Sequence, residues 1–233
     1  MAKVKKSSVI LTCLLLALLC GVLFYIEGNA SKYIIRITRL CAINIVLALS
    51  MNLVNGFTGI FSLGHAGFMA IGAYSVALLT IPVAKKETIF MLEPLIAPLN
   101  TLTLPFGVAL IIGGLRAAAL AFLIGLPCLR LRGDYLAIAT LGFSEIIRIV
   151  ITNAQCLTNG AQGLKSIPAT ANIWWCYGIA LATIIFIALL ISSSYGRAFK
   201  AIREDEIAAE SMGVSLLRHK MLSFMLSAFL AAV

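Results

Sequence analysis

Long apolar stretches constrain the fold of this sequence more than any other feature. They cover residues 8–26, 33–55, 58–81, 104–126, 135–155 and 173–192, and a seventh begins near residue 221. A helix needs about 20 mostly apolar residues to cross the hydrocarbon core of a bilayer. The stretches are continuous rather than alternating, which excludes a transmembrane β-barrel. The sequence therefore predicts an all-α, polytopic bundle of transmembrane helices, with six spans and the start of a seventh.

The composition agrees with a protein that has the lipid bilayer as its solvent. Hydrophobic residues make up 61% of the 233 residues and charged residues only 12%, whereas soluble domains have about 45–50% and about 25%. The net charge of +9 does not predict nucleic-acid binding, because the basic residues gather at the ends of the apolar stretches. The six cysteines are scattered without a Cys-x-x-Cys pair. We therefore expect neither a disulfide framework nor a metal site, and no cofactor.

The distribution of loop charges predicts the orientation in the membrane. If the N-terminus is cytoplasmic, the inside segments carry ten Lys and Arg residues and the outside segments carry four. Cytoplasmic loops are the ones that carry an excess of Lys and Arg, so a cytoplasmic N-terminus is favoured. Three lysines within residues 3–6 followed by an apolar run also resemble a signal peptide. The run 8–26 is longer than a signal core, however, which favours a retained span.

Three charged residues lie near the middle of predicted spans, whereas Arg36 and Arg39 lie near one end of the span 33–55 and are expected to be interfacial anchors. Arg116 lies near the centre of one span, Glu145 near the centre of the next, and Arg148 one turn after Glu145. An unpaired arginine at the bilayer centre costs about 2.5–3.5 kcal/mol even on the most lenient scale. Because the two spans are consecutive and antiparallel, Arg116 and Glu145 should lie at similar depth. We expect Glu145 to pair with Arg116, Arg148 or both inside the bundle, either beside a polar substrate path or as a structural clasp.

Polar and small residues are unusually frequent between residues 33 and 81. Asn44 and Asn52 fit roughly one helical face, which we expect to point toward protein or water rather than lipid. His65 would leave its ring nitrogens unsatisfied in lipid, so it should hydrogen-bond a neighbouring helix or line the path. Small residues recur at helical spacing and predict a face on which helices pack closely. The members of this predicted packing face and its entrance are Ser62, Gly64, Ala66, Gly67, Ala70 and Ala73.

Residues 193–220 form the only long hydrophilic stretch. Gly196 is expected to separate it from the sixth span, and Gly213 to end its helical part. The segment is too acidic for a helix that lies on lipid. A short two-sided helix is typical of docking into a protein groove, and a solvated loop is the alternative. Four apolar residues form a broken stripe on one side: Phe199, Ile202, Ile207 and Met212.

Four blocks, in order and spacing, resemble the M-type permeases of bacterial branched-chain amino-acid ABC importers. They are FSLGHAGFMAIGAYSVALL (61–79), LRGDYLAIATLGFSEIIRIV (131–150), TNGAQGL (158–164) and the segment 196–228, which begins GRAFKAIREDEIAAESMG. The resemblance implies a multi-pass permease of the bacterial inner membrane for leucine, isoleucine or valine, and not an enzyme. It also implies a second permease subunit, two cytoplasmic ABC ATPase subunits and a periplasmic amino-acid-binding protein as partners.

The same resemblance assigns a role to the hydrophilic stretch, as a coupling segment over 193–220. Its part EIAAESMG (206–213) looks like the permease loop that contacts the ATPase through an EAA-x3-G pattern, with the glutamate displaced by one place. No G-x-x-x-x-G-K-S/T motif occurs, so ATP hydrolysis is expected in a partner. The residues that the resemblance implies for ATPase coupling are Arg197, Ile202, Arg203, Glu206, Ala208, Ala209 and Gly213.

Permeases of this family usually continue well past residue 233, so we expect residues 1–233 to be a single permease domain that is incomplete at the C-terminus. Two alternatives remain open at this point. A sister family of urea or short-chain amide importers shares much of the pattern. A carrier or channel that works without an ATPase would leave the coupling segment without a partner.

Overall fold

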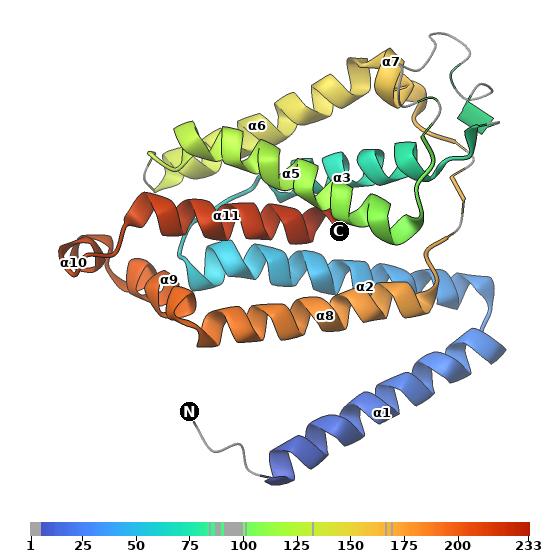
Figure 1. Cartoon of the computed structure of the whole chain (residues 1–233), viewed down its shortest axis with the longest axis horizontal. Helices are drawn as coiled ribbons and strands as arrows, with labels where there is room; N and C mark the ends of the chain where they lie inside the picture. Colours follow the sequence, from blue (N-terminus) through green and yellow to red (C-terminus); the bar gives the residue numbers. More distant parts are fainter. Residues whose placement is uncertain are drawn as a thin grey trace.

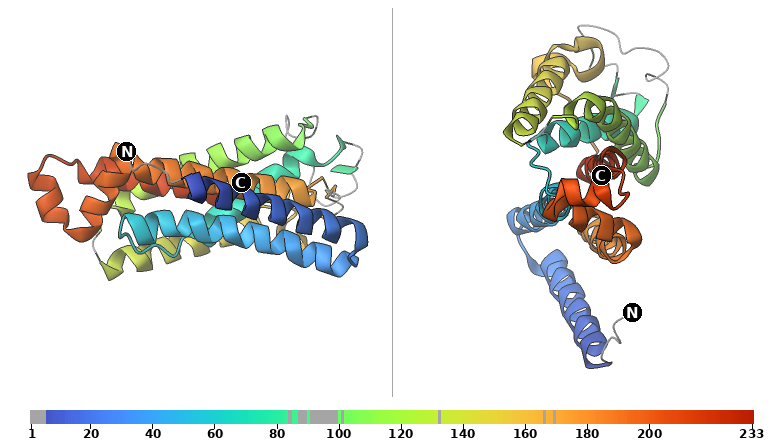
Figure 2. Two further views of the ribbon diagram at one scale, coloured as in Figure 1. Left: turned by 90° about the horizontal axis from the view of Figure 1, so that it is seen from below. Right: turned by 90° about the vertical axis from the view of Figure 1, so that its left-hand side faces the viewer.

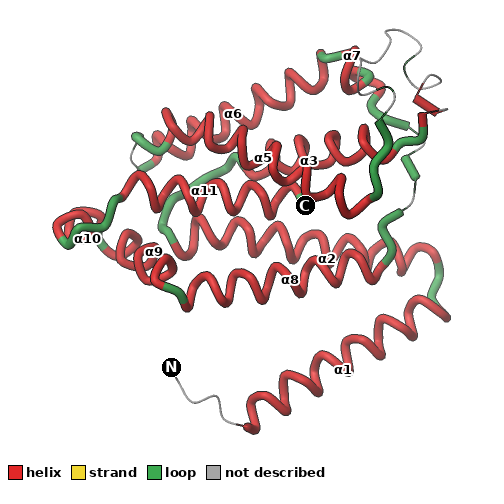
Figure 3. The backbone as a smooth tube through the Cα atoms, in the orientation of Figure 1, coloured by secondary structure: helices red, strands yellow, loops and turns green. Residues whose placement is uncertain are grey.

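The structure is a computed structural model of the chain, and it describes residues 6–83, 85–86, 90, 100, 102–131, 133–165, 167–168 and 170–233. All regular structure in this part is helical (Figure 3). Within the described ranges, four helices are long and apolar enough to cross a membrane: Lys32–Phe57, Phe106–Cys128, Asp134–Asn153 and Ile173–Ser192. Among the described residues, Ala17–Asn29 and His65–Thr80 are shorter apolar helices. The prediction of an all-α, polytopic bundle is confirmed.

The helices follow the predicted spans closely except at two places, near residue 58 and near residue 216. Helix α11 begins earlier than the predicted start near residue 221. The elements are α1 (Lys6–Asn29), α2 (Lys32–Asn52), the π-helix η1 (Leu53–Phe57), α3 (His65–Thr80), α5 (Phe106–Cys128), α6 (Asp134–Asn153), α7 (Gln155–Thr158), the 3-10 helix η2 (Gly160–Gln162), α8 (Ile173–Ser192), α9 (Ser194–Glu204), α10 (Glu206–Ser211) and α11 (Leu216–Ala232).

The predicted span 58–81 is wrong at its start, because residues 58–64 are not helical and α3 begins only at His65. The chain turns here through Gly59, whose φ of +74° disfavours other residues. Side chains supply hydrogen-bond partners that a helix would have supplied. The backbone N–H of Ser62 donates to Asn55 Oδ1 at 3.2 Å, and that of Leu63 donates to Thr140 Oγ1 of α6 at 3.1 Å. We call η1 and residues 58–64 the break.

Helix α11 lies at the centre of the bundle, between α5 and α3 on one side and α2 on the other (Figure 1). Phe224 of α11 packs edge-on against Phe68 of α3, with ring centroids 5.4 Å apart. Glycine permits the close approach of the same two helices. A Cβ atom on Gly72 would lie only 2.2 Å from the carbonyl oxygen of Ala232. Small residues let membrane helices approach closely and gain van der Waals contacts, because the hydrophobic effect does not drive helices together within lipid.

Helix α1 stands apart from the other helices in Figure 1 and in the right-hand view of Figure 2. A hydrogen bond from the indole Nε1 of Trp174 in α8 to Glu27 Oε2, 2.6 Å long, joins it to the bundle, and Leu23 of α1 is buried. At the other end of the molecule, on the left in Figure 1, lie the start of α1, the α5–α6 connection and helices α9 and α10. These are segments that the charge pattern predicts to share one side of the membrane.

Candidate functional site

The hydrophilic segment leaves the sixth apolar helix at Ser193, not at Gly196 as predicted. Ser193 has an extended backbone between α8 and α9. Gly196 lies inside α9, where a Cβ atom would come within 2.2 Å of the carbonyl oxygen of Ile191. Glycine at this position therefore allows α9 to fold back tightly against the end of α8 rather than to end a helix.

The segment then forms two short helices instead of the single helix expected over 197–213. Asp205 has an extended backbone and separates α9 from α10. Its Oδ1 accepts hydrogen bonds from the N–H groups of Ile207 (2.8 Å) and Ala208 (3.1 Å), so Asp205 is the N-cap of α10. Gly213, with a φ of +85°, ends α10 as predicted.

The predicted apolar stripe is divided between the inside and the outside of the chain. Phe199 and Ile202 are buried, whereas Ile207 is 75% exposed and Met212 is 84% exposed. Ile202 and Ala209, both expected on the ATPase-coupling surface, are buried because α9 and α10 pack against the rest of the chain through them. The other residues expected there are exposed or half-buried: Arg197, Arg203, Glu206, Ala208 and Gly213.

Arg203 connects α9 to the break. Its Nη1 donates to the carbonyl oxygen of Gly56 at 3.1 Å, and its Nε donates to Glu204 Oε1, also at 3.1 Å. Gly59 lies so close to Arg203 that a Cβ atom would be 2.9 Å from its Cγ and 3.1 Å from its Cα. Residues 147 positions apart in the chain are thus in direct contact.

An ion pair connects α10 to α11. Lys220 Nζ lies 2.6 Å from Glu206 Oε1, and the side chain of Lys220 is only 8% exposed while that of Glu206 is 40% exposed. A buried ammonium needs such a partner, because an unpaired charge away from water is costly. Glu206, expected to couple to an ATPase, therefore already has a partner within this chain.

His65 opens α3 directly after the break. It is buried, and neither ring nitrogen makes a hydrogen bond with any described residue. The backbone of Ser50 in α2 is the polar neighbour of the ring, so the expected contact with a neighbouring helix lies there but falls short of a well-formed hydrogen bond.

The small residues of α3 do not form the packed face that their spacing predicts. Ser62 and Gly64 are buried but precede the helix, and Ala70 is half-buried. Ala66 and Ala73 are exposed, because the buried side of α3 is the adjacent face that carries Phe68 and Gly72. Gly67 faces α6, where its Cβ would lie 3.2 Å from the Cα of Ser144.

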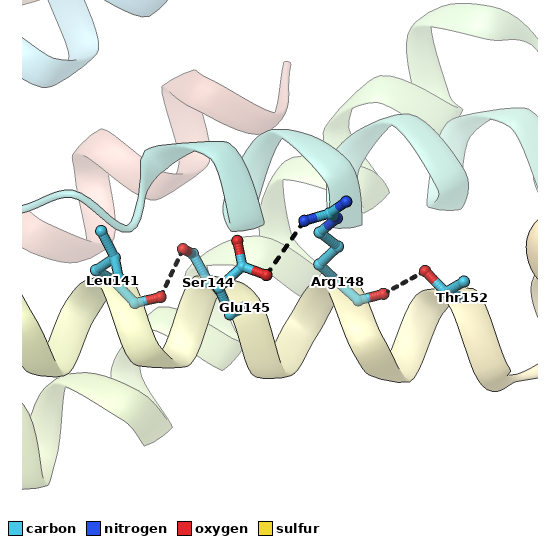
Figure 4. Close-up of polar contacts among 5 residues, drawn as sticks. All are labelled: Leu141, Ser144, Glu145, Arg148 and Thr152. Atoms are coloured by element: carbon cyan, nitrogen blue, oxygen red, sulfur yellow. Dashed lines mark hydrogen bonds and ion pairs between the residues drawn. The ribbon is translucent and has the colours of Figure 1, made fainter.

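The charged residues of the spans lie on the outside of the chain, not inside the bundle as expected. Glu145 pairs with Arg148 one turn away, with Oε2 and Nη1 3.3 Å apart, and both side chains project from one side of α6 (Figure 4). Arg116 is exposed on α5 and makes no ion pair with Glu145 in the described structure. Asn44 and Asn52 are also exposed, which contradicts the expected inward face of α2.

Comparison with known proteins identifies the family. Residues 33–233 match the family described as "Branched-chain amino acid transport system / permease component". The chain belongs to this permease family. No solved structure gives a significant match.

The relatives carry names that agree with the family. The chain is 37% identical to the "High-affinity branched-chain amino acid transport system permease protein LivM" of Escherichia coli (strain K12) over 86% of this chain and 51% of that protein. It is 35% identical, with the same coverage, to the protein of the same name from Salmonella typhimurium (strain LT2). A "Probable branched-chain amino acid transport permease protein LivM" of Methanocaldococcus jannaschii is 23% identical over 81% of this chain and 61% of that protein. The chain thus spans about half the length of the first two relatives.

Sequence reasoning missed three residues that shape these sites in this permease-family chain. Asp205 could have been found, because an aspartate directly before an alanine-rich helix is a common N-cap. The sequence places Lys220 at the end of the hydrophilic stretch, where a charged residue needs no partner, and its contact with Glu206 depends on the fold. Thr140 gives no signal in the sequence, since its role depends on the non-helical backbone at Leu63. In the described part of the chain, no group of three or more His, Cys, Asp or Glu side chains could hold a metal ion.

Proposed function

We propose that this chain is the transmembrane permease subunit of an ATP-driven ABC importer for leucine, isoleucine and valine. The observation that carries the proposal is the family match over residues 33–233, with relatives named for high-affinity branched-chain amino acid transport. The subunit is not an enzyme. It works with a second permease subunit, two cytoplasmic ATPase subunits that hydrolyse ATP, and a periplasmic binding protein that delivers the substrate.

Helices α9 and α10 dock into a groove of the ATPase subunit. Exposed Ile207 and Met212 support this role, because large apolar side chains at a hydrophilic end of a protein suit a protein contact. Closure of the ATPases on ATP would move α9 as a rigid body. The hydrogen bond from Arg203 to Gly56 would carry that movement to the break between α2 and α3.

The chain sits in the bacterial inner membrane with a cytoplasmic N-terminus. Supporting this orientation, the start of α1 and helices α9 and α10, which belong to the segment 193–220 with its five Lys and Arg residues, lie at the same end of the bundle (Figure 1). The exposed polar residues of the spans would then face the second permease subunit or the substrate path rather than lipid. They are Asn44, Asn52, Arg116, Glu145 and Arg148. Buried His65 would border the path at the break.

The coupling part of the proposal is tested with a double variant, Ile207→Asp with Met212→Asp. Both side chains are exposed, so the fold should survive, while the charges oppose an apolar contact with the ATPase. We expect pull-down of the ATPase subunits to be lost. Ile167→Asp, an exposed isoleucine at the opposite end, is the control and should leave the association intact. Unchanged association of the double variant would refute the docking.

The substrate is tested with the complete complex in liposomes. We expect ATP-dependent uptake of labelled leucine that requires the binding protein. Uptake of urea without leucine would favour the urea and amide importers instead. Uptake driven by an ion gradient in the absence of the ATPase subunits would favour a carrier.

A further inference from the structure

Glu145 and Arg148 lie near the middle of a membrane-spanning helix and yet face away from the chain to which they belong. Glu145 is about 16 Å from the start of α6, a helix about 30 Å long. The side chain of Arg148 is 76% exposed and that of Glu145 is 53% exposed. Charged side chains within membrane spans almost always face protein or a water-filled space. This side of α6 therefore does not border lipid in the assembled protein.

The contact between the two side chains is loose. The distance of 3.3 Å between Nη1 and Oε2 exceeds the roughly 2.7–2.9 Å of a strong charge-assisted hydrogen bond. In the described part of the chain, neither side chain has another hydrogen-bond partner. Arg148 keeps four of about five N–H donors free, and Glu145 keeps one carboxylate oxygen free. A structural clasp would use this capacity on a second helix, so the pair has unfilled binding capacity instead.

The surroundings of the pair are apolar on the same face of α6. Leu141 lies one turn before Glu145 and Ile149 one turn after it, and both are exposed. The two nearby hydroxyl groups do not compete for the pair, because Ser144 Oγ donates to the carbonyl oxygen of Leu141 (2.8 Å) and Thr152 Oγ1 to that of Arg148 (2.7 Å) (Figure 4). One carboxylate and one guanidinium thus stand side by side between branched apolar side chains.

We infer that Glu145 and Arg148 form a binding subsite for the zwitterionic head of an apolar amino acid. Glu145 accepts hydrogen bonds from the substrate ammonium, and Arg148 donates two hydrogen bonds to its carboxylate, a geometry that guanidinium groups favour. The substrate side chain packs against Leu141 and Ile149. Without substrate, the two side chains pair with each other and so keep the empty site neutral. This inference rests on the proposed function, and it adds the residues and the chemistry of recognition within the membrane.

The subsite makes a prediction that separates amino acids from urea. Urea is neutral and has no carboxylate, whereas the subsite needs opposite charges on one ligand. Leucinamide lacks the carboxylate and 4-methylpentanoate lacks the ammonium group of leucine. Each should lose one of the two charged contacts, and the loss of such a contact lowers affinity on the order of 10- to 100-fold.

The test measures ligand binding to the purified complex in detergent without the binding protein, by saturation-transfer difference NMR. We expect a signal from leucine, and signals from leucinamide and 4-methylpentanoate only at concentrations about 10-fold higher or more. Glu145→Gln and Arg148→Gln should each weaken leucine binding about 10- to 100-fold. Glu145→Asp, which keeps the charge, should bind leucine better than Glu145→Gln does. Asn153→Ala is the matched control, because that exposed amide donates only to its own helix at the carbonyl oxygen of Ile149.

Two results would overturn the subsite. One is normal leucine binding by folded Glu145→Gln and Arg148→Gln complexes, with melting temperatures equal to that of the wild type. The other is a wild-type complex that gives no leucine signal or binds leucine and 4-methylpentanoate equally. Uptake of leucine by the wild-type complex in liposomes distinguishes a failure of the subsite from a failure of the proposed function. If uptake occurs and the variants bind normally, only the subsite fails; if urea alone is taken up, the proposed function fails.

Discussion

The ion pair between Glu206 and Lys220 predicts an asymmetric response to mutation. The side chain of Lys220 is 8% exposed, whereas that of Glu206 is 40% exposed. Glu206→Gln leaves a buried ammonium without a charged partner. Lys220→Met leaves a carboxylate that can turn to water, and the methionine fills the buried volume. Removing the exposed partner should therefore destabilise the chain more than removing the buried one.

The size of this difference follows from the exposure of the two side chains. Removing one partner of a fully buried pair costs about 3–5 kcal/mol. Because Glu206 is partly hydrated, we use a lower value of about 2–3 kcal/mol for Glu206→Gln. For Lys220→Met we expect less than about 1 kcal/mol, since replacing a buried charge by an apolar side chain of similar volume is often neutral. A chain of 233 residues loses about 2–4 °C of melting temperature per kcal/mol.

The assay is thermal unfolding of the purified protein in detergent, followed by intrinsic fluorescence. Glu206→Gln should lower the melting temperature by about 4–12 °C, and Lys220→Met by less than about 4 °C. Glu204→Gln is the control, because Glu204 is an exposed carboxylate that pairs with Arg203 at the surface and should change little. An equal fall in melting temperature for both variants, or a larger fall for Lys220→Met, would show that the burial of Lys220 does not determine the loss of stability on breaking this ion pair.

Two further predictions concern glycines at close contacts. Gly59→Ala places a methyl group 2.9 Å from Arg203 Cγ, at a left-handed φ that costs about 1–2 kcal/mol for a residue other than glycine. We expect ATPase association to persist and leucine uptake to fall. Normal uptake would argue against transmission through the break. Gly72→Val should lower the melting temperature strongly, because its Cβ would overlap the carbonyl oxygen of Ala232 at 2.2 Å. Gly178→Ala, where a Cβ meets nothing within 4 Å, should not lower it, and equal effects of the two would refute close packing of α3 on α11.

The spans could be predicted because length and hydropathy are properties of single segments. Helices α5, α6 and α8 begin and end within about two residues of the predicted limits. The start of α3 could not be predicted in this way. Residues 58–64 continue an apolar stretch through Ile60, Phe61 and Leu63, but their backbone is non-helical, and Asn55 and Thr140 supply hydrogen bonds from elsewhere in the fold. A hydropathy scale measures the free energy of transferring side chains out of water. It contains no information on which groups hydrogen-bond the backbone N–H and C=O groups.

The neighbours of each helix face were less predictable than the helices themselves. Periodicity correctly places Ala66, Ala70 and Ala73 on one side of α3, but it does not say which side meets another helix. In this chain the neighbouring face with Phe68 and Gly72 does so. Likewise, equal depth allows Arg116 to meet Glu145, but a partner at i+3 on the same helix is nearer. One-dimensional patterns define faces, and tertiary packing decides what covers them.

Two contacts and one shared helix join the two candidate sites into one path through the molecule. Arg203 of α9 donates to Gly56 in the break, and Leu63 at the other end of the break donates to Thr140 of α6. Thr140 lies on the helix that carries Glu145, about 7–8 Å along its axis. A rigid movement of α9 would therefore reach α6 without crossing the core around α11. Contact alone does not establish coupling, so the effect of Gly59→Ala on uptake is the decisive measurement. Gly59 lies where the path enters the break and packs on Arg203, so ATPase association is measured beside uptake to separate lost docking from lost transmission.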